Sequence, residues 1–349
     1  SIHNKFLPRR EKDFDTTSVW HGEKLSKDRS ETVQPIITKT KEILDKFEKQ
    51  NLYHYRFGFT GLTCSTKYIY AAAYNFILEI NKHDFNLNRI LSNKMMCDLH
   101  GIKYINNKIY YVLTGLDTLV EMNLYGKIEN TYTVNDDLKI EKNKKNLRKT
   151  DWRFFSKLFR GPTGLFHINF IEKASSHKII NLTSRNLNSI IEINLENLNT
   201  RLKPLHINSR LMIHDGKYFK NKTYFTSVDG KILESFNNSS EAKKDIRKDY
   251  KKIQNKIYKK FSHGMITKEY NIKDFIRREP SWCRGIEKIG NNLYTLIDGR
   301  RGSKHNHMKL LKINIKNNKF EILLNLNKKI LNMKEKLSIS TGFDLLYLK

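Results

Sequence analysis

The sequence predicts an all-β fold, a β-propeller of five or six blades with short helical insertions and an N-terminal helix. Two observations lead to this prediction: a short strand-like pattern returns along the chain, and a hairpin-like pattern lies upstream of its copies. A single blade leaves both of its faces uncovered. Blades stacked around an axis bury those faces against one another, so repeats of this kind favour a propeller.

The first pattern consists of two apolar residues, a charged residue, another apolar residue and Asn. Its copies are 77–81, 119–123, 190–194 and 310–314, with a shorter copy at 232–234. The charged positions Glu79 and Glu121 are 42 residues apart, as are Glu192 and Glu234. A period of about 40 residues is typical of a four-stranded blade.

The second pattern is a strand, a polar turn and a second strand that ends in Tyr or Phe. The clearest copy runs from His100 to Tyr111 around the turn Asn106-Asn107, and related copies begin at His214 and Arg284. Alternation with period two and Asn or Gly turns predict β-hairpins. These copies resemble the repeats of YVTN/NHL-like β-propellers over residues 57–349. The resemblance implies the fold alone, because one fold hosts many functions.

Two regions are predicted from these patterns. Residues 1–56 form an N-terminal extension with a helix at 31–50, and residues 57–349 form the propeller. Apolar residues at helical spacing predict helices at 150–160 and 240–262, within insertions near 138–161 and 239–280. The C-terminal 337–349 segment is predicted as strand, which leaves five and six blades both open.

The composition favours anionic partners. There are 65 Lys and Arg against 36 Asp and Glu, a net charge of +29, which suits nucleic acid, an acidic glycan or another anion. The alternative is compositional drift, because Lys, Asn and Ile are all abundant. Three scattered cysteines predict a reducing compartment such as the cytoplasm, although the start at Ser1 is compatible with a removed leader. No apolar run is long enough to cross a membrane.

The candidate site comes from counting residues upstream of the charged position in each copy of the first pattern. His100 precedes Glu121 by 21 residues, His167 precedes Glu192 by 25, and His214 precedes Glu234 by 20. Thr60 precedes Glu79 by 19 residues, and Arg284 precedes Lys312 by 28 across a longer loop. Because the first strand of each blade lines the axis, we expect these side chains to converge on a central funnel.

Three chemistries suit such a ring. His100, His167 and His214 would hold one divalent metal ion, such as Zn, Fe or Ca, with a position left open. Alternatively, a histidine acts as general acid or base while Arg284 binds an anionic group. The third option is anion binding without chemistry, and the competing interpretation is that each histidine is structural. Asp98 and Asp215 are placed to orient imidazoles.

The predicted function is therefore an enzyme that acts on an anionic small molecule or glycan, as a hydrolase, lyase or group transferase. Its catalytic residues are His100, His167, His214 and Arg284. Its substrate-binding residues are Arg284, Thr60, Arg300, Arg301 and Lys304. The alternative is a non-catalytic basic scaffold that binds an anionic partner or a protein assembly.

Overall fold

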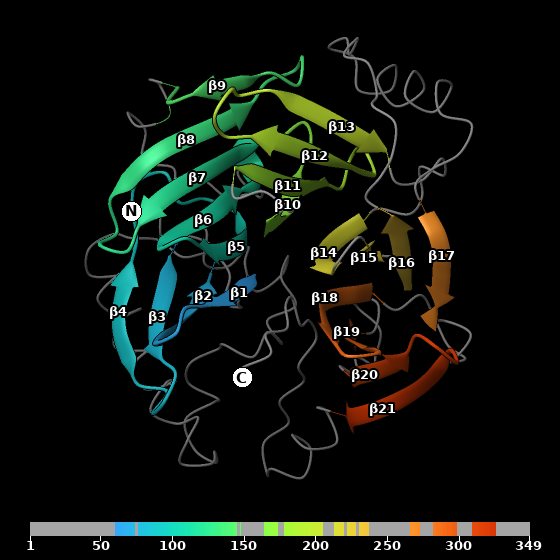
Figure 1. Ribbon diagram of the computed structural model, residues 1–349. Coiled ribbons are helices and arrows are strands. Elements are labelled where there is room, and N and C mark those ends of the chain that lie inside the picture. Colours follow the sequence, from blue (N-terminus) through green and yellow to red (C-terminus); the bar gives the residue numbers. More distant parts are fainter. Residues whose placement is uncertain are drawn as a thin grey trace, which may run out of the picture.

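The computed structural model describes five antiparallel sheets arranged around a common axis, so the chain is a five-bladed β-propeller (Figure 1). The residues that it describes are 60–73, 76–144, 147, 164–173, 178–204, 213–219, 222–227, 230–236, 266–272, 282–298 and 309–325. In every blade the strands follow one another in sequence order from the axis to the rim. This arrangement confirms the predicted fold class and settles the number of described blades at five.

Blades 1 and 2 come from the first part of the described chain. Blade 1 comprises β1 (Gly61–Cys64), β2 (Tyr68–Ala72), β3 (Ile77–Asn81) and β4 (Leu87–Leu91). Blade 2 comprises β5 (Leu99–Ile105), β6 (Lys108–Leu113), β7 (Thr118–Asn123), β8 (Ile128–Val134) and β9 (Ile140–Lys142), with the 3₁₀ turn η1 (Thr114–Leu116) between β6 and β7.

The other three blades have four strands each. Blade 3 comprises β10 (Ile168–Lys173), β11 (Ile179–Ser184), β12 (Ser189–Asn194) and β13 (Thr200–Pro204). Blade 4 comprises β14 (Ile213–Phe219), β15 (Lys222–Ser227), β16 (Lys231–Phe236) and β17 (Ile266–Asn271). Blade 5 comprises β18 (Trp282–Ile289), β19 (Asn292–Asp298), β20 (Lys309–Asn314) and β21 (Lys319–Asn325).

The hairpin turns explain why the repeats fold locally as they do. Asn106 and Asn107, between β5 and β6, have φ angles of 50° and 59°. A two-residue hairpin turn of this kind needs positive φ at both residues, and Asn tolerates it better than most side chains. Gly290 supplies the same backbone freedom between β18 and β19, with φ of 56°. The predicted turns are confirmed at both positions.

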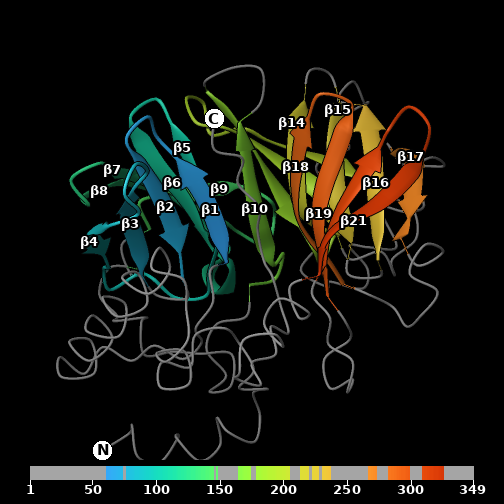
Figure 2. The ribbon, with the colours of Figure 1, turned by 90° about the horizontal axis from the view of Figure 1, so that it is seen from below.

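The core lies between the blades. One apolar cluster joins blades 1 and 2, a second joins blades 2 and 3, and a third joins blades 4 and 5. The inner strands β1, β5, β10, β14 and β18 contact one another in that order, whereas the described strands of blades 5 and 1 share no comparable contact. Seen from the side in Figure 2, these inner strands stand next to one another along the axis. Residues at matching positions in neighbouring blades are therefore brought together.

Several predicted elements lie outside the described residues: the helices at 31–50, 150–160 and 240–262 and the C-terminal strand at 337–349. The described ends of the two predicted helical insertions are strands. β9 adds a fifth strand to blade 2 inside the range 138–161, and β17 completes blade 4 inside the range 239–280. The physical reason is sheet completion, because each strand pairs with the previous outer strand over several residues.

Candidate functional site

The strand register defines which inner-strand residues are equivalent. In blade 2, Leu99 pairs with Leu113, a β-bulge follows, and Ile102 pairs with Tyr111. The same bulge recurs in the inner strands of blades 3, 4 and 5. A bulge places an extra residue opposite its partner strand and re-aims the side chains beside it. The bulge position is occupied by His100, Asn169, His214 and Arg284, and the corresponding residue of blade 1 is Thr60.

This register corrects the predicted position of His167. It stands two residues before Asn169, where blade 2 has Asp98, and the two residues share a left-handed backbone with φ of 49° and 50°. The prediction placed His167 by its sequence distance from Glu192. This distance was misleading because the β10–β11 connection of blade 3 is longer than the β5–β6 connection of blade 2. The spacing of Leu99 and Ile102, matched by Ile168 and Ile171, was the sequence signal that places Asn169 beside His100.

Glycines allow the inner strands to approach one another. A Cβ atom on Gly61 would collide with the carbonyl oxygen of His100, and a Cβ on Gly101 would collide with that of Asn169. Any other residue at these two positions would force the neighbouring backbone to move. The close packing brings the bulge positions of blades 1, 2 and 3 side by side.

The predicted histidines and Arg284 do meet. The ring centroid of His100 lies 6.0 Å from that of His167 and 6.0 Å from that of His214. A guanidinium nitrogen of Arg284 contacts Nε2 of His214. All four side chains are buried, with His214 only 3% exposed. We call these four residues and Asn169 the axial cluster.

His214 is neutral, and both of its ring nitrogens are engaged. A guanidinium has no acceptor, so Nε2 of His214 must accept the hydrogen bond from Arg284. Nδ1 then carries the proton and donates to Oδ1 of Asp215 at 2.8 Å. Burial, followed by the positive charge of Arg284, lowers the pKa of His214 to about 3. With both nitrogens occupied, His214 serves neither as a general base nor as a metal ligand in this arrangement.

Asp215 and Asp98 hold the two imidazoles differently. Asp215 accepts from the backbone amide of Gly285 at 2.7 Å, so it links blade 4 to blade 5 while it orients His214. His100 donates from Nδ1 to the backbone carbonyl of Asp98 at 3.0 Å, whereas the Asp98 carboxylate oxygen is 3.6 Å away. The orienting role of the carboxylate is therefore found for Asp215, and the backbone takes that role beside His100.

The arrangement does not match the predicted metal site. Within the part of the chain that the structure describes, no group of three or more His, Cys, Asp or Glu side chains is placed to hold a metal ion. His100, His167 and His214 are close, but the lone pair of His214 is directed at a guanidinium. A metal ion next to Arg284 would also meet like charge at short range.

The other predicted substrate-binding residues are not found as ligand-binding groups in the axial cluster. The hydroxyl of Thr60 donates a hydrogen bond to the carbonyl oxygen of Leu99 at 2.5 Å and also contacts the carbonyl oxygen of Ala72 at 3.2 Å. The Thr60 hydroxyl therefore links blade 1 to blade 2. The hydroxyl of Thr114 in blade 2 links to blade 3 in the same way, because it donates a hydrogen bond to the carbonyl oxygen of Ile168 at 2.6 Å. Arg300, Arg301 and Lys304 lie outside the described residues.

Asn169 is the residue that sequence reasoning missed. Its side chain is 1% exposed, and neither its amide nitrogen nor its amide oxygen has a hydrogen-bond partner among the described residues. Buried amides are almost always hydrogen-bonded, so the Asn169 amide is one of the exceptions among the described residues.

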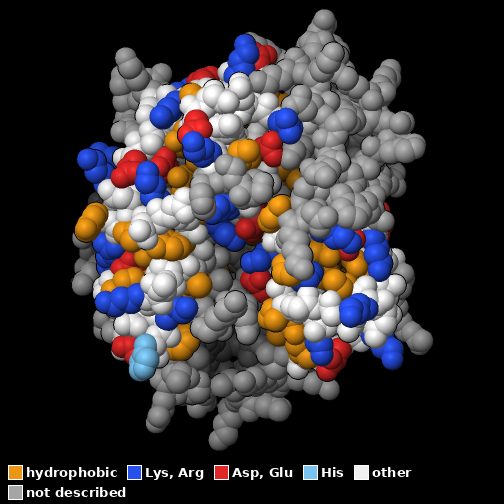
Figure 3. All heavy atoms as spheres, in the orientation of Figure 1, with side chains coloured by type: hydrophobic (Ala, Val, Ile, Leu, Met, Phe, Trp, Pro, Cys, Tyr) orange, Lys and Arg blue, Asp and Glu red, His pale blue; other side chains and the backbone are white. Residues whose placement is uncertain are grey.

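Further along the axis, charged side chains form pairs between neighbouring blades. Lys103 contacts Glu172 at 3.0 Å, and Lys217 contacts Glu287 at 2.9 Å. Figure 3, in the orientation of Figure 1, shows basic and acidic side chains next to each other near the centre of this face. These pairs neutralise one another, so this level of the axis offers no excess of positive charge.

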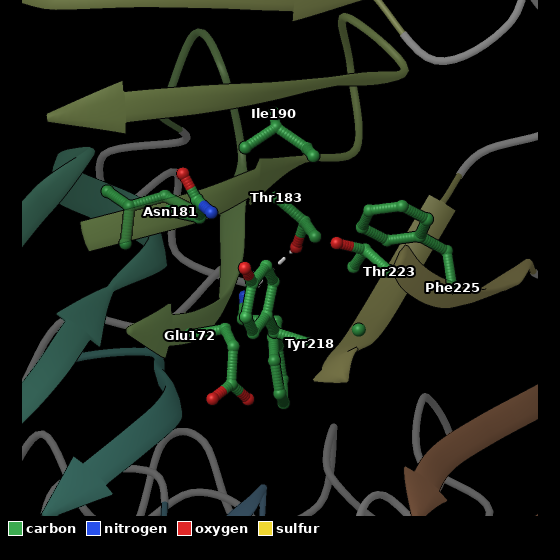
Figure 4. Close-up of a pocket in the computed structure, with 10 residues that line it drawn as sticks. Glu172, Asn181, Thr183, Ile190, Tyr218, Thr223 and Phe225 are labelled. Carbon is green, nitrogen blue, oxygen red and sulfur yellow. Dashed lines mark hydrogen bonds between the residues drawn. The ribbon is translucent and has the colours of Figure 1, made fainter. Parts of the chain in front are cut away.

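A small pocket lies between blades 3 and 4 (Figure 4). Its polar lining includes Glu172, Asn181, Thr183, Tyr218 and Thr223, and it has room for about one water molecule. In Figure 4 these side chains come from β10 and β11 on one side and from β14 and β15 on the other.

The pocket exists because blade 3 departs from the other blades. Asn181 stands where Tyr70, Tyr110, Tyr224 and Tyr294 stand in blades 1, 2, 4 and 5, as their register with the third strand shows. Between blades 1 and 2, Tyr70 stacks on Tyr104 with ring centroids 6.3 Å apart. The shorter Asn181 leaves that space unfilled.

Comparisons with known proteins bear on the fold alone. No protein-family model and no curated protein matches the sequence. Solved structures with a similar fold include the WD40 domain of Neurospora crassa Pan2, at 5% identity and a TM-score of 0.47, with 76% of this chain and 64% of that chain covered. Kuenenia stuttgartiensis hydrazine synthase gives 8% identity and a TM-score of 0.47, with 77% and 66% covered. The chain thus spans slightly less than two thirds of the length of these two solved chains.

A third similar structure is the β-propeller domain of Myceliophteria thermophila Cps50 (Swd1), at 9% identity and a TM-score of 0.46, with 77% of this chain and 87% of that chain covered. The class that fold and topology define is a five-bladed β-propeller. In the described part of the chain, no helix combines the length and the hydrophobicity needed to span a membrane.

Proposed function

We propose that this propeller binds a small polar ligand with at most one anionic group in the axial cluster, and that binding itself requires no covalent chemistry. The observation that carries the proposal is the buried amide of Asn169, whose two polar atoms have no partner among the described residues. A buried unsatisfied polar group costs about 1–3 kcal/mol. A ligand that both donates to and accepts from this amide would remove that cost.

The charges around the cluster limit the ligand. Arg284 contributes one positive charge, whereas Asp98 and Asp215 contribute two buried carboxylates. The neutral imidazole of His214 adds no charge. This balance favours a hydroxylated molecule or a monocarboxylate over a sulfated glycan or another polyanion, because like charges repel strongly where water is excluded.

The test separates a ligand-binding amide from a structural one. Asn169→Leu removes the unsatisfied polar atoms at similar volume, so the ligand-free protein should be as stable as the parent or more stable. The same variant should lose thermal stabilisation by small monocarboxylates or polyols, tested as a panel by thermal shift and calorimetry. Asn317→Leu, in the exposed β20–β21 turn, is the control.

Two results would contradict the proposal. A clear loss of stability in Asn169→Leu without any ligand would assign the amide to the fold. Binding of panel compounds with equal affinity to the parent and to the variant would place their site elsewhere.

Acid–base catalysis by His100 is the second candidate, in line with the predicted hydrolase, lyase or transferase. The observation that favours it is the position of His100, whose ring lies 6.0 Å from that of His214 and whose Nδ1 donates to the carbonyl oxygen of Asp98, which fixes the ring orientation. His100→Ala should then abolish turnover of a bound ligand while Asn169→Leu abolishes binding. Elemental analysis of the purified protein decides whether a stoichiometric divalent metal accompanies the cluster.

A non-catalytic scaffold remains the alternative to both. It predicts that a partner protein or nucleic acid binds equally well to the parent, Asn169→Leu and His100→Ala.

A further inference from the structure

The pocket between blades 3 and 4 is a second candidate site, separate from the axial cluster. With its open mouth included, it offers about 240 Å³ of space. Its walls are mostly apolar, and the larger apolar and aromatic side chains that line it are Phe170, Leu182, Ile190, Tyr218 and Phe225. A lining of this kind favours a ligand with an apolar body and few polar atoms.

At three other interfaces between blades, a tyrosine ring of the second strand fills the space where this pocket lies. Tyr70, Tyr110 and Tyr224 belong to the apolar clusters that join blade 1 to blade 2, blade 2 to blade 3 and blade 4 to blade 5. The strand register places Asn181 at this position in blade 3. Among the described residues, the interface between blades 3 and 4 therefore lacks the ring that the other three share.

Blade 4 lacks a second large side chain at the same interface. Two residues after the bulge position, blades 2, 3 and 5 have Ile102, Ile171 and Ile286, whereas blade 4 has Gly216. Part of that space is taken by the ring of Phe225, which lies 2.9 Å from the place of a Cβ on Gly216. The smaller residues on both sides of the interface explain why a pocket forms here.

Tyr218 forms an aromatic wall of the pocket. It stands four residues after the bulge position of blade 4, where blade 2 has Tyr104. Tyr70 stacks on Tyr104 with ring centroids 6.3 Å apart and an angle of 10° between the ring planes. Asn181 takes the place of Tyr70 in the blade that faces Tyr218 (Figure 4). Among the described residues, Tyr218 thus has no ring stacked on it, and a planar ring would suit this wall.

The polar groups of the pocket favour a neutral hydroxyl. Oδ1 of Asn181 is buried and has no hydrogen-bond partner among the described residues. Thr183 already donates to the carbonyl oxygen of His214 at 2.7 Å, and the carboxylate of Glu172 is paired with Lys103 at 3.0 Å. Of these three lining residues, Asn181 is therefore the one whose acceptor would gain most from a donor on the ligand.

We propose that this pocket binds the phenol ring of a ligand, which stacks on Tyr218 and donates its hydroxyl hydrogen to Oδ1 of Asn181. The ring takes the place that a tyrosine of the chain itself takes at the other three interfaces. Without a ligand the pocket has room for about one water molecule, so the ring enters from the open mouth and widens the interface. The apolar cluster that joins blades 3 and 4 is small, which makes this widening easier than at the other interfaces.

The test uses the full-length protein with labelled isoleucine methyl groups and 4-methylphenol as the probe. Increasing probe should shift the methyl signal of Ile190, which lines the pocket, to saturation. Toluene has the same shape without the hydroxyl and should bind about tenfold more weakly or worse, because it leaves the Asn181 oxygen unsatisfied. 4-Methylcyclohexanol keeps the hydroxyl without the planar ring and should also bind more weakly.

Two variants of Asn181 separate filling of the pocket from recognition of the hydroxyl. Asn181→Tyr supplies the ring that blades 1, 2 and 4 have, so it should abolish probe binding and raise the melting temperature. Asn199→Tyr, in the exposed turn between β12 and β13, is the matched control and should bind the probe like the parent. Asn181→Leu keeps a similar volume without the acceptor, so it should bind toluene and 4-methylphenol with similar affinity.

A further compound identifies the source of the ring. Nα-acetyl-tyrosine methylamide carries the same phenol on a peptide backbone. If it binds as tightly as 4-methylphenol, the pocket admits a tyrosine side chain of a partner. If 4-methylphenol binds and the peptide compound does not, the ligand is a small phenolic molecule.

Four outcomes would overturn the proposal. They are equal binding of toluene and 4-methylphenol by the parent, full binding by Asn181→Tyr, the absence of any shift at Ile190, and loss of binding in Asn169→Leu. The last result would place the phenol in the axial cluster. Binding to Asn169→Leu as tight as to the parent would show that the two sites are separate.

Discussion

At the scale of single residues, burial decides which groups keep their ordinary chemistry. His214 looks like a catalytic histidine in the sequence, yet in the structure it is a neutral acceptor for Arg284 and a donor to Asp215. Asn169 carries no chemical signature in the sequence, yet neither the nitrogen nor the oxygen of its buried amide has a hydrogen-bond partner among the described residues. The proposed function therefore rests on an unsatisfied buried group and not on the most reactive residue type.

The depressed pKa of His214 predicts acid sensitivity. Below pH 6.5 the unfolded chain binds a proton at this residue, whereas the folded protein does not until about pH 3. The free energy of unfolding should therefore fall as the pH is lowered from 6.5, by up to about 1.4 kcal/mol per pH unit from this group. Urea unfolding of the parent and of His214→Gln between pH 5 and 7.5 measures the difference. Parallel curves for the two proteins would contradict the assignment.

Asp117 predicts the opposite trend. Burial raises its pKa to about 7, even though its carboxylate accepts from the backbone amides of Phe166 and Ile168. Between its unfolded pKa near 3.9 and pH 7, the folded state holds a proton that the unfolded state lacks. Stability from this group should therefore rise as the pH falls below 7, and Asp117→Asn should remove that rise. The two residues oppose each other below pH 6.5, so each must be measured through its own variant.

At the scale of elements, the inner strand is the unit that builds the axial cluster. Each inner strand of blades 2 to 5 carries a bulge at the same place, and this irregularity aligns His100 with Asn169, His214 and Arg284. Glycine next to the bulge lets neighbouring strands approach within backbone contact.

Gly101→Ala should therefore be strongly destabilising. Its Cβ would collide with the carbonyl of Asn169, a backbone atom that cannot rotate away. Overpacking of this kind costs about 1–3 kcal/mol or more. Gly290→Ala is the control, because nothing lies within 4 Å of its Cβ and only its φ of 56° is unfavourable. Urea midpoints compare the two, and an equal or smaller loss in Gly101→Ala would refute the packing argument.

At the scale of the whole molecule, the positive charge is unevenly distributed along the chain. The described ranges hold 25 of the 65 basic residues and 18 of the 36 acidic ones. The other residues therefore carry 40 basic against 18 acidic side chains, which is 22 of the 29 net charges. The described blades carry 25 basic and 18 acidic residues, a net charge of +7, so they account for only about a quarter of the basic composition.

This distribution predicts how a polyanion would bind. A short DNA duplex should bind with an affinity that falls steeply as salt is raised, because binding releases counterions from the phosphates. Asn169→Leu should not change that affinity, since the axial cluster holds few net charges. Titration at several salt concentrations measures both effects. No binding at low salt would assign the charge to composition, and sensitivity to Asn169→Leu would place the DNA in the axial cluster.

Much of the fold was predictable, because strand alternation, Asn and Gly turns and the 42-residue spacing are local or periodic. The convergence of His100, His167, His214 and Arg284 was also predictable, because a propeller brings inner-strand starts together. The position of His167 was not, since its distance from Glu192 includes a loop whose length says nothing about register. The pocket between blades 3 and 4 was equally hidden, because it lies where Asn181 replaces the tyrosine of the other blades.

By itself, the sequence determined that this chain forms stacked antiparallel sheets, and it located the start of the inner strand in every blade except blade 3. Only the tertiary structure decided which of those residues are chemically available. The reason is that protonation, hydrogen bonding and open volume depend on groups contributed by neighbouring blades, such as Arg284 on His214, and no local pattern encodes them.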